Sequence, residues 1–265
     1  MTAIAVTIAG SDSGGGAGIQ ADLKTFSALG VYGASILTAI TAQNTRGVTA
    51  IHDVPPHIIA AQIDAVFADL AVAAVKIGML SSPLAIGAVA AGLDRFRQAQ
   101  VVLDPVMIAT SGDRLLAPDA VVALKRDLIP RALVVTPNLH EAAALTSLPL
   151  AQNEGEMRAQ ADALLALGAK AVLVKGGHAQ SAHAVDLLVT PAAAARFSAE
   201  KIETQNTHGT GCTLSAAIAA GLAKGARLAE AVADAKAYVT AALAAADDLS
   251  VGHGRGPVHH FHAWW

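Results

Sequence analysis

Short apolar runs alternate along the chain with longer stretches rich in alanine and leucine. The runs at residues 3–9, 73–77, 101–104, 133–136 and 171–175 are too short for typical helices and rich in β-branched residues, so they predict strands. They are apolar at successive rather than alternate positions, which is typical of parallel strands covered on both faces.

The longer stretches carry helix signals, such as proline in the first turn at Pro83 and a terminating glycine at Gly168. We expect helices at residues 19–29, 57–70, 83–97, 118–128, 140–146, 154–167, 211–224 and 228–246. A short apolar segment lies at 34–40, and the segments at 184–189 and 196–203 are expected to pair as strands. The alternation of strands and helices, with no linker or repeat, predicts one α/β domain spanning residues 1–265.

Composition narrows the class of protein. The 265 residues are 54% hydrophobic and 15% charged, which supports a large buried core. A net charge of −3 without any basic run argues against nucleic acid as a partner. The sequence shows neither a membrane-spanning run nor a signal peptide, and the single cysteine, Cys212, fits a reducing compartment. We therefore expect a cytoplasmic protein that binds neither membrane nor nucleic acid.

A glycine-rich segment, GSDSGGGAG at residues 10–18, separates the first strand from the first helix. Its glycine spacing does not fit the dinucleotide-binding fingerprint, and it lacks the lysine that ends a Walker A loop. Glycines allow a ligand to approach the backbone closely. The segment therefore predicts either a ligand-contacting loop or a tight turn between strand and helix.

A second glycine turn, NTHGTGCT at residues 206–213, opens the long helix expected at 211–224. Free backbone N–H groups and the helix dipole at such a position form an anion site, although an ordinary helix cap has the same pattern. Cys212 stands in this first turn, where we expect the dipole to lower the pKa of its thiol. A lone cysteine can also be a small buried apolar residue.

Polar side chains follow three of the predicted strands. Asp104 and Lys175 end strands, and Glu141 lies shortly after a third. The carboxyl ends of parallel strands line the usual ligand crevice of an open α/β sheet. Two carboxylates there can hold Mg²⁺, and a lysine can neutralise phosphate. Each residue taken alone is more typical of a solvated loop charge, and only their shared position at strand ends favours a common site.

Taken in order, these segments resemble the hydroxymethylpyrimidine/phosphomethylpyrimidine kinases of thiamin biosynthesis, within the ribokinase-like superfamily. The resemblance rests on AGSDSGGGAGIQADLKTF, TAQNT, KIGML, LDPVM, TPNLHEA, VKGGH, NTHGTGC and the C-terminal GHGRGPVHHF. It implies a ribokinase-like three-layer α/β/α sandwich with a central, mostly parallel sheet. It also implies ATP and Mg²⁺ as cofactors, a small-molecule pyrimidine as substrate, phosphorylation of both the alcohol and its monophosphate, and a homodimer.

The resemblance also assigns roles to residues. Gly10, Asp22 and Gln43 are expected to bind the pyrimidine between the apolar walls of Met79 and Val106. Cys212 is the expected catalytic base, beside an anion hole formed by Gly209, Thr210 and Gly211. For the nucleotide and the metal, the expected contacts are Lys175, Thr136, Asn138 and His208, with Asp104 and Glu141 holding Mg²⁺.

Two alternatives share this scaffold. A subset of pyridoxal kinases also carries the cysteine, so pyridoxal is the alternative substrate. A catalytically silent pyrimidine-binding protein is a third interpretation, but it should have lost Cys212 or Lys175, and both are present.

Two segments have no assigned chemistry. The histidines at 253, 259, 260 and 262 fit no structural zinc spacing, and we expect a docked terminal segment with Trp264 and Trp265 partly buried or at a subunit contact. The segment at 44–47 together with His52 is expected to be either a flap over the substrate or a surface hairpin.

Overall fold

A nine-stranded sheet forms the centre of the described part of the chain. The computed structural model describes residues 2–107, 117–177 and 182–265. In these residues the strand order is β3-β2-β1-β4-β5-β6-β7-β8-β9. The six strands from β2 to β7 in this order run parallel, whereas β3, β8 and β9 pair antiparallel at the two edges. The strands are β1 Ile4–Asp12, β2 Tyr32–Asn44, β3 Gly47–Asp53, β4 Ala74–Ile77, β5 Val101–Leu103, β6 Val134–Val135, β7 Val172–Lys175, β8 His183–Val189 and β9 Ala194–Glu200.

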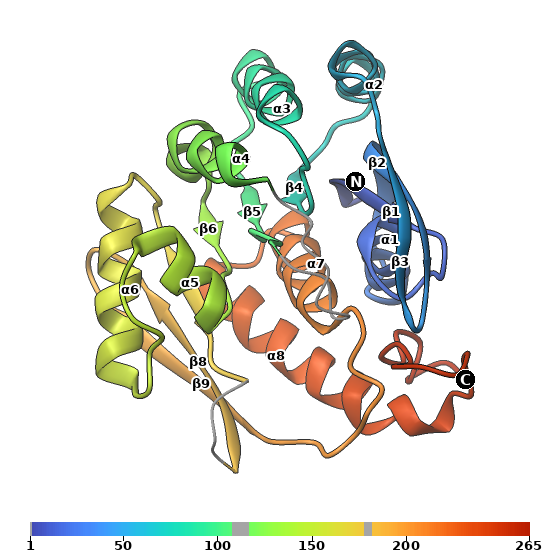
Figure 1. Ribbon diagram of the computed structural model, residues 1–265, viewed down its shortest axis with the longest axis vertical. Coiled ribbons are helices and arrows are strands. Elements are labelled where there is room, and N and C mark those ends of the chain that lie inside the picture. The colour runs from blue at the N-terminus through green and yellow to red at the C-terminus, as the bar shows by residue number, and fades with distance from the viewer. Residues whose placement is uncertain (1, 108–116, 178–181) are drawn as a thin grey trace.

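Helices cover both faces of this sheet (Figure 1). They are α1 Gly18–Ala28, α2 Pro56–Asp69, α3 Pro83–Arg95, α4 Pro118–Ala123, α5 Leu139–Thr146, α6 Glu154–Ala166, α7 Thr210–Ala223 and α8 Leu228–Ala244. One buried apolar cluster joins the sheet to the helices α2 to α6, and a second joins it to α1, α7 and α8. The expected three-layer α/β/α sandwich is therefore confirmed.

Strand β4 shows how successive residues serve the two faces. Val75 and Ile77 belong to the cluster under α2 to α6, whereas Ala74 belongs to the cluster under α1 and α7. Successive side chains of a strand point to opposite faces. Lys76 therefore points with Ala74 toward α1 and α7, although its side chain is completely buried.

Most of the elements predicted from the sequence are confirmed, with some differences in their bounds. The segment expected at 34–40 is the longer strand β2, which turns back into β3 as an edge hairpin. The helix expected at 118–128 is α4 followed by a π-helical turn, Leu124–Leu128. Within the described residues, no helix is long and apolar enough to span a membrane.

The parallel strands bring their carboxyl ends to one edge of the sheet. Asp12 ends β1, and Lys175 ends β7. Asp104 directly follows β5, and Thr136 directly follows β6. The edge therefore collects, from separate parts of the chain, the polar residues that the sequence singled out. His178 of the VKGGH motif lies outside the described residues.

Candidate active site

Two glycine-containing loops touch at this edge. Gly209 precedes α7 with φ +80°, and a Cβ added to it would lie 1.9 Å from the carbonyl oxygen of Gly16. A Cβ at Gly16 would in turn lie 2.4 Å from Cδ2 of His208. The loop after β1 and the turn before α7 therefore pack backbone to backbone, which only glycine permits.

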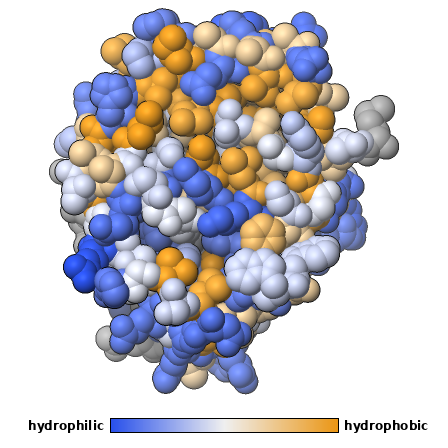
Figure 2. Space-filling view, turned by 90° about the vertical axis from the view of Figure 1, so that its right-hand side faces the viewer, coloured by the Kyte–Doolittle hydropathy of each residue, from blue (hydrophilic) through white to orange (hydrophobic). Residues whose placement is uncertain are grey.

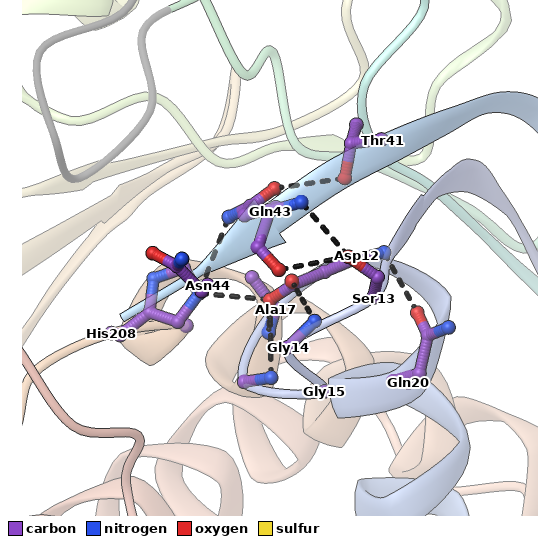
Figure 3. A network of polar contacts seen from close by, with 12 residues as sticks. Asp12, Ser13, Gly14, Gly15, Ala17, Gln20, Thr41, Gln43, Asn44 and His208 are labelled. Atoms are coloured by element: carbon purple, nitrogen blue, oxygen red, sulfur yellow. Dashed lines mark hydrogen bonds and ion pairs between the residues drawn. The ribbon is translucent and has the colours of Figure 1, made fainter. Parts of the chain in front are cut away.

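Asp12 organises the glycine-rich loop (Figure 3). Its carboxylate accepts backbone hydrogen bonds from Gly14 at 2.8 Å, Gly16 at 3.1 Å and Ala17 at 2.8 Å. It also lies 2.9 Å from Nε2 of His208. Burial alone would raise the pKa of Asp12, but these hydrogen bonds, led by that of His208, hold it below its usual value. The sequence placed Asp12 in the loop without a role, and its position two residues before the first of three consecutive glycines was the only signal.

Gln43, an expected substrate ligand, lies beside this loop near the end of β2 (Figure 3). Its backbone N–H donates to Ser13 Oγ at 2.8 Å, and Thr41 Oγ1 donates to its side-chain Oε1 at 3.1 Å. Its Nε2 lies 3.4 Å from Nε2 of His208. His208, expected to contact the nucleotide, lies against Asp12 and Gln43 beside the glycine-rich loop, and its contact with the nucleotide stays a prediction.

Gly10 and Met79 meet on the other side of the loop. A Cβ at Gly10 would lie 3.2 Å from the sulfur of Met79. Met79 is buried, and its carbonyl oxygen accepts a hydrogen bond from Thr38 Oγ1 at 2.8 Å. Val106, which follows β5, is half-buried. Glycine at position 10 therefore lets the backbone pass close to the Met79 side chain, and its contact with a ring stays a prediction.

Asp22 has a different environment from the one predicted. Its side chain is fully buried, accepts a hydrogen bond from Thr7 Oγ1 at 2.6 Å, and forms an ion pair with Lys76 Nζ at 2.8 Å. Both carboxylate oxygens are bonded within the protein. In this conformation the Asp22 carboxylate is occupied by its hydrogen bonds to Thr7 and Lys76 and is not available to bind a substrate. Sequence reasoning gave no role to Lys76, although it opens the KIGML motif and is a lysine inside an apolar strand.

Cys212 lies in the first turn of α7, where its thiol meets the backbone N–H of Gly18 at the start of α1. Burial raises the pKa of the Cys212 thiol to about 11, against the lowering effect of Lys76. The expectation that the helix terminus alone would make this cysteine a thiolate was wrong, because the loss of solvent outweighs the dipole.

Asp104 and Lys175 form a buried ion pair at 2.8 Å between the ends of β5 and β7. Asp104 also accepts from Thr136 Oγ1 at 3.2 Å and from Ser215 Oγ at 3.2 Å. Burial raises the pKa of Asp104, but Lys175 and Lys76 hold it below its usual value. A Cβ at Gly211 would lie 3.3 Å from Lys175 Nζ, so the turn before Cys212 reaches this ion pair.

Glu141 caps helix α5 together with Asn138. The Glu141 carboxylate accepts from the backbone N–H of Asn138 at 2.8 Å, and Asn138 Oδ1 accepts from the backbone N–H of Glu141 at 2.9 Å. Burial raises the pKa of Glu141 to about 7, against the lowering effect of Lys175, and the charge of Asp104 adds to the rise. The residues described include no group of three or more histidine, cysteine or carboxylate side chains that could hold a metal.

The C-terminal segment docks against the turn before α7. His208 N–H donates to the Gly256 carbonyl at 3.0 Å, and Tyr238 hydroxyl donates to the His260 carbonyl at 2.6 Å. Burial lowers the pKa of His260 to about 3, so its ring is neutral. The docked segment is confirmed, but Trp264 and Trp265 are 69% and 72% exposed in the single chain, so of the two expected alternatives the subunit contact stays a prediction.

A glycine turn at a helix N-terminus, a lysine–carboxylate pair and a thiol meet at one edge of a largely parallel sheet. This combination defines a small-molecule kinase, because it offers backbone donors and a cation to a transferring phosphate beside a group that can take a proton. The family model for phosphomethylpyrimidine kinase matches residues 12–259. The chain belongs to the phosphomethylpyrimidine kinase family.

Related proteins and solved structures support the same family membership. The chain is 66% identical to the hydroxymethylpyrimidine/phosphomethylpyrimidine kinase of Rhizobium meliloti over 100% of this chain and 99% of that protein. It is 54% identical to the Escherichia coli protein of the same name, with 98% of each chain covered. Pyridoxal kinase of Bacillus subtilis, solved as an ADP complex, superposes with a TM-score of 0.91 at 38% identity and 99% coverage of both chains. The Clostridium difficile phosphomethylpyrimidine kinase superposes with a TM-score of 0.80 at 47% identity, covering 89% of this chain and 97% of that one.

Proposed function

We propose that residues 1–265 form one kinase domain that transfers the γ-phosphate of ATP to 4-amino-5-hydroxymethyl-2-methylpyrimidine and then to its monophosphate. The observation that carries the proposal is the position of the turn Gly209–Cys212. Its first residue touches the loop of Gly16, and Gly211 touches Lys175. Cys212 therefore lies where an acceptor beside the glycine-rich loop and a phosphate beside Lys175 would meet.

In this proposal, residues of this chain carry out each step of the phosphoryl transfer. Gly10, Gln43, Met79 and Val106 would hold the pyrimidine ring with its hydroxymethyl group toward Cys212. The hydroxyl oxygen forms a bond to the γ-phosphorus, its proton passes to the sulfur of Cys212 in the thiolate form, and the bond to ADP breaks. The backbone N–H groups of Gly209, Thr210 and Gly211 would receive the charge that develops on the phosphoryl oxygens.

On the nucleotide side, Lys175 would neutralise phosphate charge, and Thr136 and Asn138 would line the site next to it. Asp104 already holds Lys175 in place through their ion pair. The ion pair balances the charge of Lys175 when no phosphate is bound, so this largely buried lysine remains available to bind the phosphates.

Asp104 and Glu141 fit Mg²⁺ in their chemistry, since both are buried carboxylates at this edge. With only two carboxylates, the metal would arrive on the nucleotide phosphates rather than in an all-protein cage. When bound, Mg²⁺ would neutralise charge on the transferring phosphate.

This assignment predicts a pH-dependent demand for Mg²⁺. Because the pKa of Glu141 is about 7, its carboxylate is mostly protonated at pH 6 and mostly ionised at pH 8. The Mg²⁺ concentration for half-maximal rate should therefore fall about tenfold between these values. Glu141→Gln keeps the capping acceptor but should flatten the dependence.

Initial rates at several Mg²⁺ concentrations and pH values measure this effect. Glu203→Gln, at an exposed position, is the control and should behave like the unchanged protein. A Glu141→Gln variant with the full pH dependence would remove Glu141 from the metal site.

The proposed substrates are tested by incubating the protein with Mg-ATP and each pyrimidine. Masses of the products should show the monophosphate from the alcohol and the diphosphate from the monophosphate. If only the first product forms, the second step is not catalysed by this chain. If neither forms, the proposed acceptor is wrong.

Pyridoxal is the second candidate acceptor. The observation in its favour is the structural similarity to pyridoxal kinases, including a Staphylococcus aureus enzyme in complex with AMP-PCP and pyridoxal at a TM-score of 0.90 and 32% identity. Its hydroxymethyl group on a six-membered nitrogen ring presents the same reacting oxygen.

We further propose a homodimer formed through the hairpin β2–β3 and helix α2. Apolar side chains are exposed on these elements: Tyr32, Ile40, Ile51 and Ile58. Figure 2 shows hydrophobic residues gathered over the part of this face that carries them. Exposed apolar residues beside a sheet edge favour association.

Light scattering tests the dimer. The unchanged protein should have twice the mass of one chain, and Ile40→Glu/Ile51→Glu should have the mass of one chain. Val122→Glu, on the exposed side of α4, is the matched control and should remain dimeric. A double variant that stays dimeric would place the interface elsewhere.

A further inference from the structure

Lys76 is a fully buried cation beneath the proposed active site. Its side chain is completely inaccessible, and its Nζ lies 2.9 Å and 2.8 Å from the two carboxylate oxygens of Asp22. Asp22 also accepts from Thr7 on the neighbouring strand β1. A buried charge is expensive unless it is paired, and a buried ion pair is often no more stable than an apolar pair. The fold alone therefore gives no reason for a lysine at this position.

Helix α1 relates this ion pair to Cys212. Cys212 lies in the first turn of α7, and α7 packs both against α1, which carries Asp22, and against β4, which carries Lys76. The ion pair of Asp22 and Lys76 therefore joins the two elements that α7 covers.

The loop that follows β4 covers the ammonium group of Lys76. A Cβ at Gly78 would lie 2.8 Å from Lys76 Nζ, so the loop runs directly over the ammonium. Met79, the next residue, belongs to the proposed ring-binding wall. Lys76 thus lies directly under the acceptor site without reaching into it.

Four charged side chains from separate parts of the chain influence the pKa of the Cys212 thiol. Lys76 from β4 and Lys175 from β7 favour its thiolate, whereas Asp22 from α1 and Asp104 after β5 oppose it. Lys76 is the strongest influence that lowers the pKa of the thiol. Burial would lower the pKa of Lys76, but Asp22, Cys212 and Asp104 raise it, so the ammonium stays charged.

We propose that Lys76 is a positioning residue for phosphoryl transfer, whose ammonium, anchored by Asp22, stabilises the thiolate of Cys212. The thiolate then takes the acceptor's proton as the oxygen–phosphorus bond forms, and the resulting thiol returns that proton to solvent after the products leave. The inference rests on the proposed function, in which Cys212 is the base. An ion pair with a merely structural role would leave the chemistry of Cys212 unchanged.

The test uses the fact that Cys212 is the only cysteine in the chain. The rate of alkylation by iodoacetamide at pH 8.5, without nucleotide or Mg²⁺, reports the thiolate fraction of this one residue. The key variant is Asp22→Asn/Lys76→Met, which makes both partners neutral at similar size and avoids an unpaired buried charge. Its alkylation should be about tenfold slower than that of the unchanged protein, the equivalent of one pKa unit.

Lys76→Met alone leaves only the opposing charge of Asp22 and should slow alkylation further. Equal alkylation rates of all variants in denaturant, together with cooperative unfolding of each, show that the difference belongs to the folded state. An alkylation rate in the double variant equal to or above that of the unchanged protein would overturn the role of Lys76.

Activity separates this inference from the proposed function. We expect kcat of the double variant to fall in the same proportion as its alkylation rate, with little change in KM for ATP. Slower alkylation with unchanged kcat would keep the effect of Lys76 on the thiolate but would overturn its role in transfer, because Cys212 would then not be the base.

Discussion

Replacing Cys212 by alanine is expected to lower kcat for pyrimidine phosphorylation by about 10²–10⁴-fold, the usual contribution of a general base. The thiol lies in the first turn of α7, at the junction of the glycine-rich loop and the turn before this helix. KM for both substrates should change little, because the sulfur acts on the proton and not on the ring or the nucleotide.

Steady-state kinetics of Cys212→Ala beside the unchanged protein measure this effect. An unchanged unfolding temperature serves as the control that the loss is chemical. If the variant retains kcat within a factor of about three, far below the effect of losing a general base, the base must be another group.

Replacing Gly209 by alanine is expected to damage both stability and activity. Its φ of +80° disfavours any side chain, and the added Cβ would lie 1.9 Å from the Gly16 carbonyl oxygen. The turn and the loop would have to separate, moving the backbone donors away from the phosphoryl group. We expect kcat to fall by at least about 10²-fold, as when an oxyanion donor is lost.

Gly225 provides a matched control. Its φ is +87°, but nothing lies within 4 Å of an added Cβ. Gly225→Ala should therefore lose only about 1–2 kcal/mol of unfolding free energy, the strain of the left-handed conformation, with full activity. Denaturant unfolding of the two variants compares them. Equal losses, with activity kept in both, would show that the contact between Gly209 and Gly16 is unimportant.

The sequence was sufficient for most of the fold because its strands are buried on both faces. Runs such as Val101–Leu103 carry an uninterrupted apolar pattern, and their alternation with helices leaves few possible topologies. The length of β2 was underestimated, because its last residues leave the core and pair with β3 at the sheet edge. Exposed edge residues carry no apolar periodicity that marks where a strand ends.

The site was predicted less completely than the fold. Motif resemblance gave Cys212 the role of the base, which stays a prediction, but the protonation of its thiol depends on solvent exclusion and on charges from distant strands. The same limit applies to Asp22, whose partner Lys76 lies 54 positions away. His208 was expected to contact the nucleotide, and its hydrogen bond with Asp12, 196 positions away, could not be predicted from its neighbours in the sequence.

The central claim is that this chain phosphorylates a pyrimidine alcohol. It is tested most directly by measuring kcat/KM for hydroxymethylpyrimidine and for pyridoxal in the same Mg-ATP assay, from the release of ADP. The account predicts a higher value for the pyrimidine, with activity toward both acceptors lost in Cys212→Ala. A higher value for pyridoxal, or no release of ADP with the pyrimidine, would contradict it.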